Sequence, residues 1–336
     1  MTIIGSRPQF IKAAPVSSAL RNAGINHIIV NTGQHYDFNM SEIFINELNI
    51  SKPDYNLSVG SNSHAKQTSD IICKVEEIIL TVKPHAVLVY GDTNSTLGAA
   101  IAVSKLKIPL IHIEGGLRSF NKAMPEEINR VITDHISSIL FCPSNISKNN
   151  LSQEGIEKNV FVVGDVMYDI FKKWEEKFNS KNRYGDYVLL TMHRAENTMP
   201  DMLRKRLAQL SELAMKIIFP IHPRTKKVLA QNEITIPKNM QIIEPMGWLE
   251  LMGIGRNARF IITDSGGLQK EALWLKKHCL TIREQTEWVE TIQQHVNQLV
   301  KVDDNISIPA LRKGDFSNPY GDGDASEKII DIIKSI

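Results

Sequence analysis

The chain has 336 residues, of which 42% are hydrophobic and 23% charged, a composition typical of a globular protein large enough for two domains. Its net charge of +2 is spread over scattered basic residues, which argues against a nucleic-acid-binding surface. No apolar run reaches the ~18 residues of a membrane span, and the first residues do not read as a secretory signal. The three cysteines, Cys73, Cys142 and Cys279, lie far apart. We therefore expect a cytoplasmic protein with free thiols, and neither a disulfide framework nor a zinc site.

Short apolar runs alternate with segments of helical periodicity along nearly the whole chain. They predict one series of strands at residues 2–4, 27–33, 85–91, 109–115, 139–143 and 160–164. A second series follows at residues 187–193, 216–222, 240–245, 259–267 and 278–284. Helices fit between them, for example over 64–83 and 95–106. Continuous apolar runs of this kind are typical of strands that are buried on both faces of a parallel sheet.

The two series have a similar rhythm, which predicts an α/β protein of two doubly wound domains. The break is expected near residues 164–169, because the following "FKKWEEKFNSKNRYGD" reads as a charged helix and loop. In such sheets, ligands bind beyond the carboxyl ends of the strands, so the residues at those ends are the candidates for chemistry.

Two strand ends have the composition of an anion-binding site. The first strand is followed by "GSRPQFIK", where a helix N-terminus with Arg7 and Lys12 suits an anion, although a turn glycine before a solvated helix explains the stretch equally well. In "TDSGGLQKEA" (263–272), glycines precede another helix and allow close approach of a phosphate, while Glu271 could reach a ribose diol. The alternative is a plain strand-to-helix turn. No GxGxxG or GxxxxGK[ST] motif supports an NAD or ATP site of the usual kinds.

Carboxylates follow two neighbouring strands. Asp92 ends the run "HAVLVYGD" and Glu114 ends "PLIHIEG", so the two are expected to converge, and carboxylates that share a site can serve as an acid and a base. Glu126 and Glu127 follow Pro125 at the start of a helix, where acidic residues are also favoured by the helix dipole alone.

Two histidines, His193 and His222, end successive strands of the second series, and each is closely followed by an arginine. A lone histidine is usually structural, but this repetition favours a functional role. A metal is the competing explanation for the carboxylates, yet no metal-binding motif occurs. Arg7, Lys12, Arg283 and a helix N-terminus would make a magnesium ion unnecessary for binding a pyrophosphate. We expect neither a metal nor another cofactor.

Ten stretches taken together resemble the non-hydrolysing UDP-N-acetylglucosamine 2-epimerase family, and they occur in family order over essentially the whole chain. They are "GSRPQFIKAAP", "TGQHYD", "VLVYGDTNSTL", "HIEGGLRS", "PEEINR", "TMHRAEN", "PIHPRT", "TDSGGLQKEA", "REQTEWVE" and "NPYGDGDA". The resemblance implies two Rossmann-like domains with the active site in a cleft between them (GT-B-like). The expected domains are 1–165 with 318–336 and 166–317, because the last helix would cross back onto the first domain. The family also implies a homodimer.

The resemblance assigns roles to individual residues. For UDP binding it implies Ser265, Gly266 and Gly267 at the diphosphate, Glu271 at the ribose, Arg7 at the phosphates and His222 near the nucleotide. For catalysis it implies Asp92, Glu114, Glu126 and His193. UDP would leave C1, a carboxylate would remove the C2 proton to form a 2-acetamidoglucal, and protonation from the opposite face with return of UDP would give the C2 epimer. Products of this kind feed surface polysaccharides such as capsule and O-antigen.

Several alternatives stay open at this point. "QTEWVE" and "VGDVMYD" resemble the branch of the family that acts on UDP-2,3-diacetamido-2,3-dideoxyglucuronate equally well. A hydrolysing epimerase, a GT-B glycosyltransferase and a non-catalytic UDP-sugar-binding protein are the other candidates. Gly115 stands where many members have alanine. Only Gln34 and His35 remain of the motif that accompanies allosteric activation by substrate, so this regulation is doubtful here.

Overall fold

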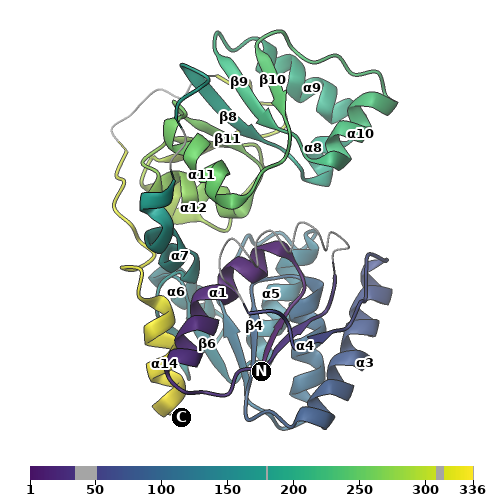
Figure 1. The fold of residues 1–336 in the computed structure, drawn as a ribbon, viewed down its shortest axis with the longest axis vertical. Helices are drawn as coiled ribbons and strands as arrows, with labels where there is room; N and C mark the ends of the chain where they lie inside the picture. The colour runs from purple at the N-terminus through teal and green to yellow at the C-terminus, as the bar shows by residue number, and fades with distance from the viewer. Residues whose placement is uncertain (35–50, 179–180, 308–313, 336) are drawn as a thin grey trace. The chain divides into compact units, whose positions relative to one another are not determined.

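The computed structural model describes residues 1–34, 51–178, 181–307 and 314–335, except for the side chains of Arg7 and Ala195. The chain forms two compact units, each described here by itself (Figure 1). The first unit consists of Met1–Lys173 together with Pro319–Ile336, and the second consists of Trp174–Asn318. His35, which was considered above as part of a regulatory motif, lies outside the described residues.

The first unit is built on a seven-stranded sheet with the order β3-β2-β1-β4-β5-β6-β7. Its strands are β1 (Thr2–Ile4), β2 (Ile29–Asn31), β3 (Tyr55–Asn56), β4 (Val87–Tyr90), β5 (Leu110–Ile113), β6 (Ile139–Cys142) and β7 (Val160–Val162). The neighbouring strands pair in parallel, with Val87 beside Leu110 and Ile111 beside Ile139 as examples of the register. Every residue of β4 and β5 is buried, as expected for central strands that are covered on both faces.

Helices cover both faces of this sheet (Figure 1). They are α1 (Arg7–Asn22), α3 (His64–Val82), α4 (Asn94–Ser104), α5 (Pro125–Ile136), α6 (Asn145–Gln153), α7 (Val166–Trp174) and α14 (Ala325–Ser335). The helices α3, α4 and α5 pack side by side, and α14 packs against α1. The carboxylate of Asp169 in α7 accepts hydrogen bonds from the backbone N–H groups of Ala325 (3.1 Å) and Ser326 (2.7 Å). A side chain of α7 thus holds the first turn of α14.

The second unit is built on a six-stranded parallel sheet with the order β10-β9-β8-β11-β12-β13. Its strands are β8 (Tyr187–Thr191), β9 (Lys216–Pro220), β10 (Met240–Ile243), β11 (Ile261–Thr263), β12 (Cys279–Thr281) and β13 (Asn297–Leu299). Its helices are the short 3₁₀ turn η1 (Glu175–Lys177), α8 (Ala195–Thr198), α9 (Pro200–Ser211), α10 (Pro223–Gln231), α11 (Trp248–Asn257), α12 (Gly266–Trp274) and α13 (Val289–Gln293).

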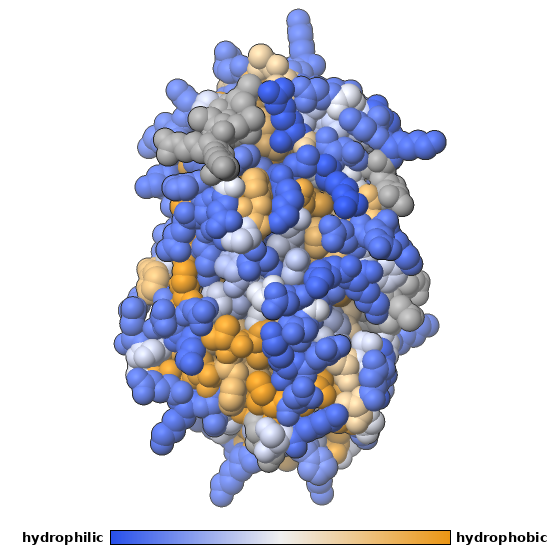
Figure 2. Space-filling model, turned by 90° about the vertical axis from the view of Figure 1, so that its left-hand side faces the viewer, coloured by the Kyte–Doolittle hydropathy of each residue, from blue (hydrophilic) through white to orange (hydrophobic). Residues whose placement is uncertain are grey.

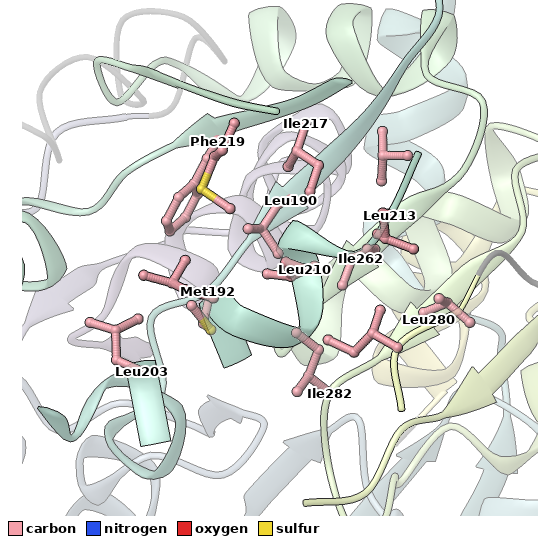
Figure 3. Close-up of a cluster of buried hydrophobic side chains, with 14 of the residues drawn as sticks. Leu190, Met192, Leu203, Leu210, Leu213, Ile217, Phe219, Ile262, Leu280 and Ile282 are labelled. Carbon is pink, nitrogen blue, oxygen red and sulfur yellow. The ribbon is translucent and has the colours of Figure 1, made fainter. Parts of the chain in front are cut away.

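The core of the second unit lies between its sheet and the helices that follow the strands (Figure 3). Side chains of β8, β9, β11 and β12 meet those of α9 there, among them Leu190, Phe219, Ile262 and Leu210. In the first unit a separate cluster joins β1, β2, β4 and β5 to α3 and α4. Each unit therefore has a hydrophobic core of its own.

The α/β class with two doubly wound parallel sheets is confirmed. The edge strands β3 and β13 were not predicted from the sequence, because neither "YN" nor "NQL" is a continuous apolar run. Hydrophilic side chains cover most of the face drawn in Figure 2, and hydrophobic ones gather in its lower part. In the described part of the chain, no helix combines the length and the apolar character that crossing a membrane requires.

Candidate functional site

In each unit several of the candidate residues follow the strands at which the sheet order changes direction. In the first unit these strands are β1 and β4, and in the second they are β8 and β11. Loops beyond the carboxyl ends of such strands form the ligand crevice of doubly wound sheets. The loop after β4 carries Asp92, the loop after β8 carries His193, and the loop after β11 leads into Ser265.

The loop after β1 is held by Gln9, a residue that the sequence analysis did not single out. Its side-chain oxygen accepts hydrogen bonds from the N–H groups of Gly5 (2.8 Å) and Ser6 (3.1 Å). Its side-chain nitrogen donates to the Tyr90 carbonyl (2.8 Å) and to Thr96 Oγ1 (2.9 Å). Gln9 thereby fixes the loop to the end of β4. The side chain of Arg7, the first residue of α1, is outside the described part of the structure.

Lys12 and Glu114 form an ion pair in the first unit, in which Glu114 is buried and Lys12 is partly buried. Burial lowers the pKa of Lys12, but the negative charges of Glu114, Asp92 and Asp165 outweigh burial and raise the pKa above its usual value, so that the ammonium stays charged. Glu114 has a left-handed backbone (φ +75°), and its N–H and that of Gly115 both donate to the Phe141 carbonyl (3.0 Å each). A non-glycine residue in this conformation is strained, which is common at functional sites.

Asp92 pairs with Arg130 of α5. The same guanidinium also contacts the carboxylate of Glu127 (2.9 Å), and both Arg130 and Glu127 are buried. Asn129 of α5 donates to the backbone carbonyl of Asp92 (2.9 Å). Two side chains of α5 thus fix the position of Asp92.

The structure separates the roles of the two adjacent acidic residues at the start of α5. Glu127 is buried and accepts hydrogen bonds from the N–H groups of Ser119 (2.8 Å) and Phe120 (2.8 Å) as well as from Arg130. Glu126 is half-buried, and it has no ion pair or side-chain hydrogen bond among the described residues. Glu127 is therefore a structural residue that shapes the preceding loop, and Glu126 remains the candidate for chemistry.

A network of polar side chains, buried except for Glu154 at its end, lies beneath these carboxylates. His112 Nδ1 contacts Asp134 Oδ1 (2.6 Å), and His112 Nε2 contacts the Gly91 carbonyl (2.9 Å). Arg118 donates to Asp134 Oδ2 (2.6 Å) and to both oxygens of Glu154 (2.6 and 2.8 Å). Burial raises the pKa of Asp134, yet the charges and hydrogen bonds of His112 and Arg118 prevail and hold it below its usual value.

In the second unit, Asp264 organises the loop that carries His193. It accepts hydrogen bonds from the N–H groups of His193 (3.0 Å) and Arg194 (2.9 Å) and from Asn197 (3.2 Å), and its carboxylate lies 3.1 Å from His193 Nδ1. Burial raises the pKa of Asp264, but the hydrogen bonds and the charge of His193 lower this pKa by more than burial raises it. The net shift is therefore downward. The His193 side chain is about half exposed (48%) and is therefore accessible to a ligand.

Helix α12 begins at Gly266, and its N-terminus lies next to a buried ion pair. Glu287 Oε2 is 3.0 Å from Arg283, and a Cβ added at Gly266 would lie only 2.7 Å from Glu287 Oε1. A side chain at position 266 would therefore displace a carboxylate that pairs with Arg283. The hydroxyl of Ser265, the N-cap residue, makes no capping hydrogen bond to α12.

Two further residues that the sequence indicated for the nucleotide have contacts within the second unit. Glu271 is buried and accepts a hydrogen bond from the Trp248 indole (2.6 Å). His222 is the N-cap of α10, and its Nδ1 accepts a hydrogen bond from the Arg224 N–H (3.2 Å). His222 therefore has a structural role whether or not it also contacts a ligand.

The structure brings Lys12, Asp92 and Glu114 together in the first unit, and it places His193 and Ser265 on neighbouring loops of the second. No group of three or more His, Cys, Asp or Glu side chains suited to a metal ion occurs within the described ranges. Five residues of the site were not predicted from the sequence: Gln9, His112, Arg130, Asp134 and Trp248. Arg130 was open to prediction because it lies one helical turn after Glu126, and Gln9 because it stands three residues after Ser6 in a capping box. His112, Asp134 and Trp248 depend on contacts between distant segments.

Comparisons with known proteins agree with this architecture. A family model described as UDP-N-acetylglucosamine 2-epimerase matches residues 18–334. A protein of Methanococcus maripaludis named UDP-N-acetylglucosamine 2-epimerase homolog is 47% identical, covering 100% of this chain and 99% of its own. The UDP-2,3-diacetamido-2,3-dideoxy-D-glucuronate 2-epimerase of Pseudomonas aeruginosa is 42% identical with the same coverage. The crystal structure of Methanocaldococcus jannaschii UDP-GlcNAc 2-epimerase in complex with UDP-GlcNAc and UDP is 42% identical, with a TM-score of 0.93 over 100% of this chain and 99% of that one.

Proposed function

The chain belongs to the UDP-N-acetylglucosamine 2-epimerase family, and from this premise we propose that it interconverts UDP-N-acetylglucosamine and UDP-N-acetylmannosamine without net hydrolysis. The observation that supports this reaction most directly is the set of carboxylates in the first unit. Asp92 faces the buried Arg130, Glu114 faces the partly buried Lys12, and Glu126 lies in the first turn of the helix that supplies Arg130. A protein that only binds a UDP-sugar has no need of this set.

The chemistry explains why several carboxylates are needed. The hydrogen at C2 of the sugar is not adjacent to a carbonyl, so its direct removal is unfavourable. In the proposed reaction the C1–O bond breaks first, UDP departs with the bonding electron pair, and a carboxylate takes the C2 proton to leave a neutral 2-acetamidoglucal. A second group returns a proton to the opposite face of C2, and UDP adds back at C1. Proton carriers are therefore needed on both faces of the ring.

The described contacts suit this reaction. Negative carboxylates near C1 stabilise the oxocarbenium-like charge that develops when UDP leaves. Lys12 and Arg130 hold Glu114 and Asp92 in fixed positions and balance their charge. We assign proton transfer to Asp92, Glu114 and Glu126, and we assign a role in catalysis to His193, whose ring is accessible and anchored by Asp264.

We further propose that the second unit holds most of the nucleotide. The N–H groups of Gly266 and Gly267, at the start of α12, suit the diphosphate because they carry the positive end of the helix dipole, and the hydroxyl of the N-cap residue Ser265 is assigned to the same group. Glu271 suits the ribose hydroxyls as an acceptor. The remaining residues that we assign to UDP are Arg7, Lys12, His222 and Arg283. Lys12 and Arg283 are each paired with a glutamate in the structure, so they would act by balancing charge near the phosphates.

Proton NMR of the purified protein with UDP-N-acetylglucosamine in heavy water, without added metal, tests the proposed function. We expect UDP-N-acetylmannosamine with deuterium at C2. Release of free N-acetylmannosamine and UDP would indicate a hydrolysing epimerase instead. An unchanged substrate would favour a glycosyltransferase or a binding protein, provided that the second candidate substrate is also unchanged. A chelator added to the active sample is expected to leave the rate unaltered, and loss of activity that magnesium restores would contradict a metal-free reaction.

A second candidate substrate is UDP-2,3-diacetamido-2,3-dideoxyglucuronate. It is favoured by the 42% identity to the Pseudomonas aeruginosa enzyme of that name, which extends over the whole chain. The two substrates differ by a C6 carboxylate and a second acetamido group, so the ratio of their kcat/KM values decides between them. We also propose that the protein is a cytoplasmic homodimer that serves surface polysaccharide synthesis, such as capsule or O-antigen. Light scattering of the purified chain tests the dimer.

A further inference from the structure

His112 lies in β5, two residues before Glu114, and connects two turns that carry candidate catalytic carboxylates. Through Nε2 it contacts the carbonyl of Gly91, the residue before Asp92. Through Nδ1 it contacts Asp134, whose other oxygen accepts a hydrogen bond from the N–H of Gly116 (3.1 Å), two residues after Glu114. One buried ring therefore joins the turn after β4 to the turn after β5.

The partners of His112 determine the form of its ring. A backbone carbonyl only accepts hydrogen bonds, and an ionised carboxylate also only accepts them. Both ring nitrogens of His112 must therefore donate, which requires the doubly protonated imidazolium. A ring with a single proton would lose either the contact to Gly91 or the contact to Asp134.

Gly91 is the point at which this network reaches the carboxylates. Its backbone is left-handed (φ +62°), and a Cβ added there would lie 3.0 Å from Glu114 Oε2 and 3.1 Å from Lys12 Nζ. Gly91 thus abuts the Lys12–Glu114 ion pair and is covalently joined to Asp92. A shift of its peptide group by a few tenths of an ångström would displace both carboxylates at once.

The other end of the network consists of two further ion pairs. Asp134 Oδ2 also accepts a hydrogen bond from Arg118, whose guanidinium donates to both carboxylate oxygens of Glu154. Two cations, His112 and Arg118, thus face two anions, Asp134 and Glu154. A buried network with balanced charges and satisfied hydrogen bonds holds a single arrangement well.

We propose that His112 is a positioning residue for the epimerisation. Its hydrogen bonds to Gly91 and Asp134 form a clamp that fixes the Asp92 turn and the Glu114 turn relative to each other. This inference rests on the proposed function, because the carboxylates that it positions are those assigned to proton transfer. His112 itself is not assigned any contact with substrate.

The chain provides a matched control in His27. Its ring also makes two side-chain contacts in the first unit, from Nδ1 to Ser17 Oγ (3.1 Å) and from Nε2 to Thr2 Oγ1 (2.9 Å). Its partners are hydroxyls, which donate or accept, and burial lowers the pKa of His27 to about 4, so this ring is neutral. It contacts neither of the two carboxylate turns.

The test replaces each histidine by asparagine and by glutamine. The amide of His112→Asn imitates Nδ1 and keeps a donor toward Asp134, whereas the longer His112→Gln imitates Nε2 and keeps a donor toward Gly91. Each variant breaks the clamp on one side. We expect kcat on UDP-N-acetylglucosamine to fall by about 10²-fold in both variants, as a misplaced reacting group predicts. KM and the Kd for UDP should stay within about threefold, because ground-state binding is not altered.

His27→Asn and His27→Gln should lower Tm without changing kcat at temperatures well below Tm. Free UDP released per molecule of epimer should rise only in the His112 variants, because a misaligned proton transfer leaves the glucal longer in the site. The proposal is overturned if both His112 variants keep kcat within about threefold of the wild type. The proposal is also overturned if kcat falls in proportion to Tm in the His27 variants as well as in the His112 variants, because the effect would then be one of stability alone.

A measurement on the wild-type protein keeps the inference testable if the His112 variants fail to fold. ¹⁵N NMR of histidine-labelled protein at pH 7 should show a proton on both ring nitrogens of His112 and on one ring nitrogen of His27. A singly protonated His112 would contradict the clamp. If the wild type does not epimerise either candidate substrate, the proposed function fails, while the ring spectrum still decides whether the clamp exists.

Discussion

The carboxylate of Asp92 and the guanidinium of Arg130 form an ion pair that joins the end of β4 to α5. The pair fixes a candidate proton carrier on a loop by means of a helix that also presents Glu126. The same helix therefore orients two of the three carboxylates assigned to proton transfer.

The first prediction concerns Asp92. Asp92→Asn keeps the shape of the side chain and removes its ability to carry a proton, so turnover should fall by about 10²- to 10⁴-fold. The Kd for UDP, measured by calorimetry, should be nearly unchanged. Asp70→Asn is the control, because Asp70 pairs with Lys66 on the exposed surface of α3 (2.6 Å) and should have no effect on turnover. Wild-type turnover in Asp92→Asn would remove Asp92 from the mechanism.

The second prediction compares the adjacent residues Glu126 and Glu127. Glu126→Gln should reduce turnover by orders of magnitude and leave Tm unchanged, since Glu126 has no described structural contacts. Glu127→Gln replaces an acceptor of hydrogen bonds from Ser119, Phe120 and Arg130, so it should lower the free energy of unfolding by about 1–3 kcal/mol. Thermal denaturation and the NMR assay measure the two effects. Lost stability in Glu126→Gln together with lost turnover at unchanged Tm in Glu127→Gln would assign the catalytic role to Glu127 and the structural role to Glu126.

The third prediction concerns the ribose site. Trp248→Phe removes the indole donor to Glu271 but keeps a ring against Phe178, whose centroid lies 5.3 Å from that of Trp248. The unrestrained carboxylate should bind UDP more weakly by about 1 kcal/mol, or roughly fivefold in Kd. Glu271→Ala should weaken UDP binding further.

Trp274→Phe is the control for this prediction, because it removes an indole donor to Asn318 (3.0 Å) elsewhere in the second unit. It should leave UDP affinity unchanged. Equal loss of affinity in Trp248→Phe and Trp274→Phe would show that the effect is general, and unchanged affinity in Glu271→Ala would refute the ribose role.

The fourth prediction concerns pH. The pKa of Asp264 is lower in the folded protein than the usual value of 3.8, so its ionised form stabilises the fold at every pH above that value. This contribution should be lost as pH falls from about 4 through the lower folded pKa. The difference in unfolding free energy between the wild type and Asp264→Asn, measured with urea from pH 7 to pH 3, should therefore be constant down to about pH 4 and then shrink. A difference that grows in acid would contradict this assignment.

The sequence indicated most of the fold because buried parallel strands are continuous apolar runs. It also indicated where the candidate residues would lie, since Asp92, Glu114 and Ser265 directly follow such runs. The short edge strands β3 and β13 escaped because their pairing is set by neighbours and not by their own pattern. The expected domain limits, 1–165 with 318–336 and 166–317, stay a prediction.

The hydrogen-bond partners of individual side chains could not be predicted from the sequence. His112 lies within an apolar run and resembles a core residue until Asp134, 22 positions later, is seen beside it. From the residues alone the choice between Glu126 and Glu127 was also undecided, because helix-dipole arguments apply equally to both, and only the family resemblance selected Glu126. Only the three-dimensional arrangement shows that Glu127 faces the loop at Ser119 and Phe120.

The contact of Asp169 with Ala325 and Ser326 has a consequence for synthesis on the ribosome. The first unit needs a helix from the last residues of the chain, whereas the second unit is a continuous segment. Asp169 must stay hydrated until residue 326 has left the exit tunnel, and burial raises its pKa once α14 docks. The second unit is thus completed by translation before the first. Nascent chains arrested soon after residue 318 has left the tunnel should therefore resist protease over 174–318 while 1–173 remain susceptible.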